Sequence, residues 1–180
     1  MFCSMQMVST AYRSPAFRFW MASLICAAWI VLILSFAFQH FDDQDLRPFL
    51  RERISEEALQ KVLPSVEFTY AGSLLSYREP HRFAHFLLRK GAHVFIYAAL
   101  AFFVVYQQLL AGRGAAGAFG RALLLVFAVA AADEFIQHLH EGRTGLVEDV
   151  VLDLSGSVFA LGWLTLRERR ELGRAWRLVY

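Results

Sequence analysis

The sequence predicts an all-α integral membrane protein, a bundle of four transmembrane helices with a small extracytoplasmic cap. Apolar residues make up 57% of the 180 residues and charged residues only 19%, a balance typical of membrane proteins rather than soluble domains. Four apolar runs suit a crossing of about 30 Å of hydrocarbon at about 1.5 Å per residue. These runs are residues 19–38, 91–110, 122–139 and 150–166.

The first run, residues 19–38, contains no charged residue. Its cleavage signal is weak, only Ser35 and Ala37, so we expect a retained helix rather than a signal peptide. The two cysteines, Cys3 and Cys26, support neither a disulfide framework nor a cysteine metal site. The net charge of +2 gives no reason to expect a nucleic-acid partner.

Residues 39–90 form a polar segment outside the membrane. Apolar residues recur at three- and four-residue steps between positions 46 and 62, which predicts one amphipathic helix ended by Pro64. Alternation over positions 66–70 predicts a short extended piece before a turn at Ala71-Gly72. This segment is either a cap on the membrane surface or a solvated connector. His81, His85, His138 and His140 are expected in solvent or headgroup contacts near the outer interface.

Arginine placement predicts the orientation. Nine arginines lie in the N-terminal tail (residues 1–18), the glycine-rich turn 111–121 and the C-terminal tail (residues 167–180). The positive-inside rule therefore predicts a multi-pass protein of the inner membrane with both termini in the cytoplasm. Residues 19–166 form the membrane domain, and residues 112–120 are expected to be a flexible turn.

Costly polar side chains recur in three of the predicted spans at helical spacing, and all of them face the same side of the membrane. They are Lys90, His93 and Tyr97, then Asp133, Glu134 and Gln137, then Asp149 and Asp153. One isolated carboxylate at this depth costs at least about 2.5–3.5 kcal/mol. We therefore expect the acids to pair with Lys90, His93 or Arg143 in one cluster in the outer half of the bilayer.

These motifs, in this order, resemble those of the VanZ-like family of bacterial membrane proteins. The matching text is Arg89-Lys90-x-x-His93-x-x-x-Tyr97, Asp133-Glu134-x-x-Gln137, Arg143, and Asp149-x-x-x-Asp153-x-x-Gly156. The resemblance covers roughly residues 20–166. It implies a small multi-spanning protein, linked in some members to resistance against teicoplanin-type glycopeptide antibiotics, and it implies no established reaction.

The cluster first predicts a site for a membrane lipid or an isoprenoid-linked precursor of the cell envelope. A phosphate there would be held by arginine in two hydrogen bonds and by lysine as a point charge. Glu134, paired with His93, would act as general acid or base. The expected catalytic residues are Glu134, His93 and Asp133, and the expected substrate-binding residues are Lys90, Arg143, Tyr97, Gln137, Asp149 and Asp153.

Three alternatives stay open at this stage. Glu134, Asp149, Asp153 and His93 could hold a divalent metal in an intramembrane hydrolase, but the spacing is not that of a known metal motif, so no metal or cofactor is expected. A binder or transport-like protein, as a monomer or a homodimer, needs no catalysis. Finally, the polar groups could simply hold the helices in register.

Overall fold

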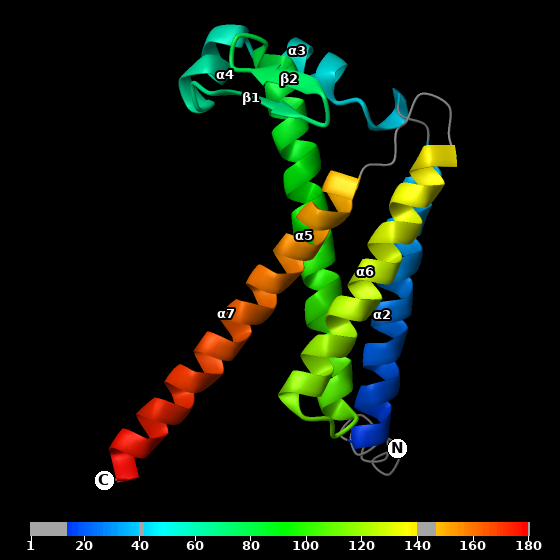
Figure 1. The fold of residues 1–180 in the computed structure, drawn as a ribbon, viewed down its shortest axis with the longest axis vertical. Helices are drawn as coiled ribbons and strands as arrows, with labels where there is room; N and C mark the ends of the chain where they lie inside the picture. Colours follow the sequence, from blue (N-terminus) through cyan, green and yellow to red (C-terminus); the bar gives the residue numbers. More distant parts are fainter. Residues whose placement is uncertain (1–13, 40–41, 140–146, 180) are drawn as a thin grey trace, which may run out of the picture.

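The computed structural model describes residues 14–39, 42–139 and 147–179. Four long helices dominate it, and they are α2 (Pro15–Ala37), α5 (Pro80–Leu110), α6 (Ala115–Leu139) and α7 (Val147–Val179). The start of α2, the turn between α5 and α6 and the end of α7 lie at one end of the molecule (Figure 1). The opposite end carries the shorter elements.

Within the described residues, three helices are long and apolar enough to cross a membrane, namely α2, α5 and α6. Ser14 begins α2 by accepting a hydrogen bond from the Phe17 amide, with Pro15 in the first turn, where a missing amide hydrogen costs nothing. The expected fourth span, residues 150–166, lies inside α7. Its crossing of a membrane stays a prediction.

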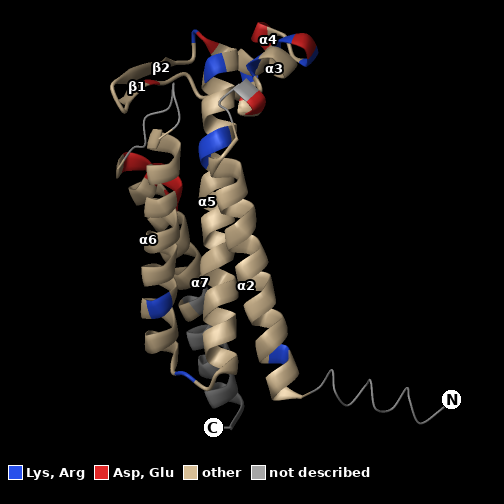
Figure 2. Ribbon diagram, turned by 90° about the vertical axis from the view of Figure 1, so that its right-hand side faces the viewer, with Lys and Arg blue, Asp and Glu red and all other residues tan. Residues whose placement is uncertain are grey.

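Helix α5 is the central helix, since α2, α6 and α7 all pack against it. The shared core is apolar and buried, and it contains Leu100, Val104, Ala118, Ala122 and Val126. Figure 2 shows long uncharged stretches of these helices below a group of acidic and basic segments. The acidic residues and many of the basic ones of the described part therefore lie toward the end that carries the shorter elements, whereas the opposite end shows only basic residues (Figure 2).

The glycine-rich turn is shorter than predicted. Helix α5 ends at Leu110, Gly112 takes a positive φ of 75°, and α6 already begins at Ala115. Glycine adopts this left-handed conformation without strain, which is why it terminates helices. Gly117 and Gly120 lie inside α6, where burial of Ala118 and Ala122 against the bundle outweighs their weak helix propensity.

Residues 42–79, here called the connecting segment, join α2 to α5. In place of one amphipathic helix they form η1 (Asp42–Gln44), α3 (Arg47–Arg53) and α4 (Glu56–Val62). The break comes at Ile54, which is extended, and at Ser55, whose hydroxyl accepts from the Ala58 amide and caps α4. A serine followed by acidic residues is a strong helix start, so the prediction of one continuous helix was wrong.

The extended piece is one strand of a hairpin. Strand β1 (Glu67–Tyr70) pairs antiparallel with β2 (Ser73–Ser76). Ala71 and Gly72 both have positive φ, 49° and 77°, as the tight two-residue turn of a hairpin requires. The hairpin folds back toward α5, and Phe68 and Tyr70 contact Phe86 there.

His81 and His85 anchor the connecting segment to α5. Both are buried. The His81 Nε2 atom lies 2.9 Å from the Ile54 carbonyl, and the Leu46 amide donates to His85 Nδ1 at 3.4 Å. The expectation that these two histidines contact solvent or headgroups was therefore wrong, because the backbone of the connecting segment covers them. His140 lies outside the described residues.

Candidate functional site

Four side chains from three helices meet near the end of the bundle that carries the connecting segment. They are His93 of α5, Asp133 and Glu134 of α6, and Asp153 of α7, here called the acidic cluster. Each offers one nitrogen or oxygen atom, and these four atoms all lie within 4.8 Å of one another. The three carboxylates are buried, with at most 5% of each residue exposed.

Asp133 is held firmly by two neighbours. The Tyr97 hydroxyl donates to its Oδ2 at 2.8 Å, and the Gln137 side-chain amide donates to its Oδ1 at 2.9 Å. Tyr97 is 1% exposed and Gln137 5%. Both therefore act as positioning residues, since two hydrogen bonds fix the plane of the carboxylate.

Asp153 has different surroundings. It is fully buried, and among the described residues no group donates a hydrogen bond to either of its carboxylate oxygens. Its nearest cationic group is His93, whose Nδ1 lies 3.6 Å from Oδ1. Buried carboxylates are normally hydrogen-bonded, so this one is poised for a partner beyond the described protein atoms.

A glycine brings Asp153 this close to α5. A Cβ atom at Gly156 would lie 2.7 Å from the Val94 carbonyl oxygen, so only glycine fits where the two helices touch. The adjacent Ser157 hydroxyl donates to the Tyr97 carbonyl at 3.1 Å. This small-residue contact between α5 and α7 thus sets the spacing of the cluster.

Lys90 and Asp149 form a separate group with Tyr70, here called the lysine bridge. The Lys90 ammonium and the Tyr70 hydroxyl both donate to Asp149 Oδ1, and the Lys90 nitrogen lies 5.0 Å from the centre of the Tyr70 ring. Burial, together with the Asp149 carboxylate, raises the pKa of the Tyr70 phenol, which therefore stays protonated as a donor. The lysine bridge ties β1 to α5 and α7.

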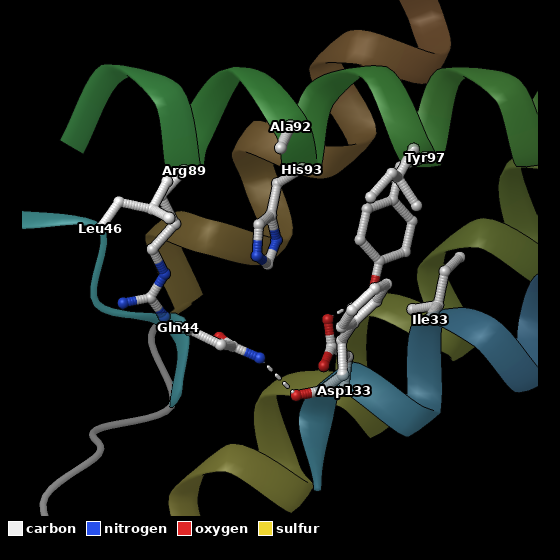
Figure 3. Close-up of a pocket in the computed structure, with 10 residues that line it drawn as sticks. Ile33, Gln44, Leu46, Arg89, Ala92, His93, Tyr97 and Asp133 are labelled. Carbon is white, nitrogen blue, oxygen red and sulfur yellow. Dashed lines mark hydrogen bonds between the residues drawn. The ribbon is translucent and has the colours of Figure 1, made fainter. Parts of the chain in front are cut away.

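A cavity of about 290 Å³ adjoins the acidic cluster between α2, α5 and α6. Its wall includes the apolar Ile33, Phe36, Leu46 and Ile96. Its polar lining includes Arg89, His93 and Asp133, and Figure 3 shows Arg89, His93 and Tyr97 reaching from α5 into this space. An apolar chamber with a few convergent polar groups is the usual form of a small-ligand site.

A second cavity lies on the other side of the cluster, between α6 and α7. Its volume is about 470 Å³, and its lining includes Phe127, Glu134, Phe135 and Val150. Glu134 lines this cavity, whereas His93 and Asp133 line the first. The acidic cluster therefore stands between two mainly apolar chambers.

Comparison with protein-family models confirms the family resemblance that the motifs indicate. The VanZ/LLP1 family model matches residues 20–167. The chain belongs to the VanZ/LLP1 family. Comparisons with curated proteins and with solved structures find no match.

The VanZ/LLP1 match spans every residue of the cluster and of the first cavity. Of the site residues predicted from sequence, the structure brings His93, Asp133, Glu134 and Asp153 together, with Tyr97 and Gln137 in support. Lys90 and Asp149 lie in the lysine bridge instead. Arg143 is outside the described residues.

Sequence reasoning did not assign Arg89 to the site of this VanZ/LLP1 protein. Its guanidinium lines the first cavity and donates to the Gln137 side-chain oxygen at 3.4 Å. A signal was present, because Arg89, His93 and Tyr97 are spaced i, i+4, i+8 and share one helix face. Lys90, one position on, points about 100° away around the helix.

Proposed function

We propose that this VanZ/LLP1 protein binds a phosphate-bearing membrane lipid, such as an isoprenoid-linked envelope precursor, and acts on its headgroup. The observation that carries the proposal is the first cavity, in which an apolar wall meets Arg89, His93 and Asp133. A lipid with a charged head needs this combination. The apolar wall accepts the chain, and the polar end accepts the head.

Arg89 is the proposed phosphate ligand. A guanidinium forms two parallel hydrogen bonds to phosphate oxygens and is always charged. Lys90, expected from the sequence for this role, is engaged by Asp149. Arg89 lines the cavity beside His93 and also donates to the Gln137 side-chain oxygen.

The acidic cluster supplies acid–base chemistry at the head. Glu134 lies beside the first cavity, within 4.8 Å of the nearest His93 and Asp133 ligand atoms, and takes a proton from a water molecule whose oxygen attacks the phosphorus atom. The phosphorus–oxygen bond to the leaving group breaks, and His93 donates a proton to the departing oxygen. Asp133, oriented by Tyr97 and Gln137, completes the polar end of the cavity.

We further propose that α7 supplies a fourth crossing and that the termini are cytoplasmic, as the arginine distribution indicates. The start of α2, the α5–α6 turn and the end of α7 share one end of the molecule (Figure 1). The cavity then opens in the outer half of the bilayer, and the connecting segment caps it. A role in tolerance to teicoplanin-type antibiotics stays a prediction of the family resemblance, testable by susceptibility with and without the protein.

Lipid binding by the purified chain in nanodiscs tests the proposal. Native mass spectrometry with undecaprenyl phosphate should show saturable binding, and Arg89→Met should weaken it about tenfold or more, since a charged hydrogen bond contributes about 1.5–3 kcal/mol. Arg82→Met is the matched control, because Arg82 lies on the same helix and pairs with Glu79 at an exposed position. Equal affinity of the Arg89 variant and the wild type for undecaprenyl phosphate would contradict the proposal.

Binding and turnover separate through Glu134→Gln. If the protein is an enzyme, this variant binds the lipid nearly as the wild type does and releases no phosphate-containing product. A variant that turns over lipid normally would exclude Glu134 as the base. If neither protein turns over lipid while both bind it, the function is binding alone.

A purely structural role suits Tyr97 and Gln137, whose hydrogen bonds join α5 to α6 and brace one turn of α6. It does not account for Asp153, whose oxygens accept no hydrogen bond from the described residues. Polar residues that hold helices together do so by forming hydrogen bonds between the helices.

A further inference from the structure

We propose that the acidic cluster is a binding site for one divalent cation, held by His93, Asp133, Glu134 and Asp153. The proposal goes beyond lipid binding and does not depend on it. With the ion bound, His93 and Glu134 are ligands, so their proposed acid–base roles belong to the metal-free protein. It rests on the geometry of the four side chains and on the surroundings of Asp153.

The geometry suits a single ion. Four potential ligand atoms from three helices lie within 4.8 Å of one another. Two atoms bound to one ion at about 2.0–2.2 Å each are separated by roughly 3–4.4 Å, depending on the angle at the metal. A shift of a few tenths of an ångström in these side chains would therefore bring all four around one centre.

Electrostatics favour the same position. Three carboxylates that crowd one buried space repel one another. A divalent cation between them would attract all three at once, and this attraction is strong where the dielectric constant is low. Because the carboxylates are at most 5% exposed, solvent screens neither the repulsion nor the attraction.

Asp153 is the second, independent indication. It is fully buried, its side chain enters the cluster, and among the described residues nothing donates a hydrogen bond to either of its oxygens. Its neighbour Asp149, by contrast, is fully engaged by Lys90 and Tyr70. A metal ion would give Asp153 the partner that the described protein atoms do not.

The surroundings resemble those of established metal ligands. Asp133 accepts hydrogen bonds from Tyr97 and Gln137, and such outer contacts orient a ligating carboxylate while leaving it lone pairs for the metal. Three oxygens and one imidazole nitrogen suit Mn²⁺ or Zn²⁺, whereas Ca²⁺ needs six to eight oxygens. The four-ligand set also leaves room for a water or substrate oxygen on the ion.

The set differs from the one considered from sequence. There, Asp149 was a ligand and Asp133 was not. The structure reverses the two, because Lys90 holds Asp149 in the lysine bridge while Asp133 lies in the cluster with His93. No lysine takes part in the set.

The test is Mn²⁺ binding by the full chain, purified in detergent, stripped with chelator and titrated under electron paramagnetic resonance, which detects the free ion. We expect saturable binding of about one Mn²⁺ per chain, displaced by Zn²⁺. Asp153→Asn, which keeps the shape of the side chain, should weaken binding about tenfold or more. Glu148→Gln, an exposed carboxylate on the same helix, is the matched control and should bind as the wild type does.

Three results would overturn the proposal. They are no saturable uptake of Mn²⁺ or Zn²⁺ by the wild type, unchanged binding by Asp153→Asn, or equal loss in Glu148→Gln. In the first case, protons rather than a metal ion balance the carboxylates. The wild-type titration alone decides the matter if the Asp153 variant does not fold.

Lipid binding is measured separately on the metal-free chain, so the two proposals fail independently. A protein that binds undecaprenyl phosphate but no metal contradicts only the cation site. A protein that binds Mn²⁺ but no lipid contradicts only the proposed function. Arg82→Met should leave Mn²⁺ affinity unchanged, because Arg82 is exposed and pairs with Glu79 away from the cluster.

Discussion

Two aspartates lie four residues apart on α7 and have opposite surroundings. Asp149 receives the Lys90 ammonium and the Tyr70 hydroxyl. Asp153, deeper in the bundle, receives no hydrogen bond to its carboxylate from the described residues. A satisfied buried charge holds structure together, whereas an unsatisfied one weakens it unless something else binds there. The contrast separates the lysine bridge, a structural joint, from the acidic cluster, which we propose as a site for chemistry.

The largest effect is expected from breaking the lysine bridge. Lys90→Met leaves Asp149 buried without its cation and should lower the free energy of unfolding by about 3 kcal/mol, the lower end for a broken buried pair since Tyr70 still donates. Denaturant unfolding in detergent, followed by circular dichroism, measures it. Asp153→Asn should not lower stability in metal-free buffer, because it removes no hydrogen bond and relieves the repulsion among the buried carboxylates. If Asp153→Asn costs as much as Lys90→Met, the two aspartates do not differ as described.

The close contact of α5 and α7 gives the next effect. Gly156→Ala places a methyl group 2.7 Å from the Val94 carbonyl oxygen, and the overpacking should cost about 1–3 kcal/mol. It should also move Asp153 away from His93. Gly162→Ala, with nothing within 4 Å of the new Cβ, should be neutral or slightly stabilising because alanine is the better helix former. Equal unfolding midpoints for the two variants would contradict the tight packing.

A smaller effect is expected at the support of the cluster. Tyr97→Phe removes the hydroxyl that donates to Asp133 and should cost about 1–2 kcal/mol. Tyr106→Phe on the same helix is the control, since among the described residues the Tyr106 hydroxyl accepts its hydrogen bond from the exposed side chain of Arg18. Thermal unfolding of both variants measures the difference, and a Tyr106 variant as unstable as the Tyr97 variant would argue against a special role for Tyr97.

The smallest effect lies in the connecting segment, outside the three helices that are long and apolar enough to cross a membrane. Hydrogen bonds from Arg47 lower the pKa of Asp45 from 3.8 to about 2. Because the folded pKa is depressed, the stabilisation is present above pH 4 and is lost as pH falls from about 4 to 2. For a pair so near the surface it amounts to under about 1 kcal/mol. Unfolding at pH 5 and at pH 2.5 should show a smaller pH effect in Asp45→Asn and in Arg47→Met, and an unchanged pH effect in both would exclude this pair.

Helical spacing was enough to predict that three helices direct His93, Asp133 and Asp153 to one place. It was also enough to identify the family, because the motifs that carry the resemblance are the cluster residues themselves. The spacing of the motif residues depends on one helix at a time. Spacing within a helix is fixed by 3.6 residues per turn, whatever the rest of the chain does.

The division between the two aspartates could not be predicted from spacing. It depends on Tyr70, which reaches Asp149 only because the Ala71-Gly72 turn folds the hairpin back over α5. The roles of Arg89 and Lys90 are exchanged for the same reason. Lys90 pairs with Asp149 in the lysine bridge, whereas Arg89 lines the first cavity. The helix break at Ser55 was hidden because the apolar pattern continues across it, although the serine cap was present in the sequence.

The central claim is that the acidic cluster acts on a lipid, and the most direct measurement compares membranes rather than purified protein. Cells producing equal amounts of wild type, Glu134→Gln or Glu148→Gln are extracted, and phosphate-bearing isoprenoid lipids are quantified by mass spectrometry. We predict that the wild type and Glu148→Gln alter the pool alike, while Glu134→Gln leaves it as in cells without the protein. A pool that is the same in all four strains, or that Glu134→Gln alters as the wild type does, would contradict the account.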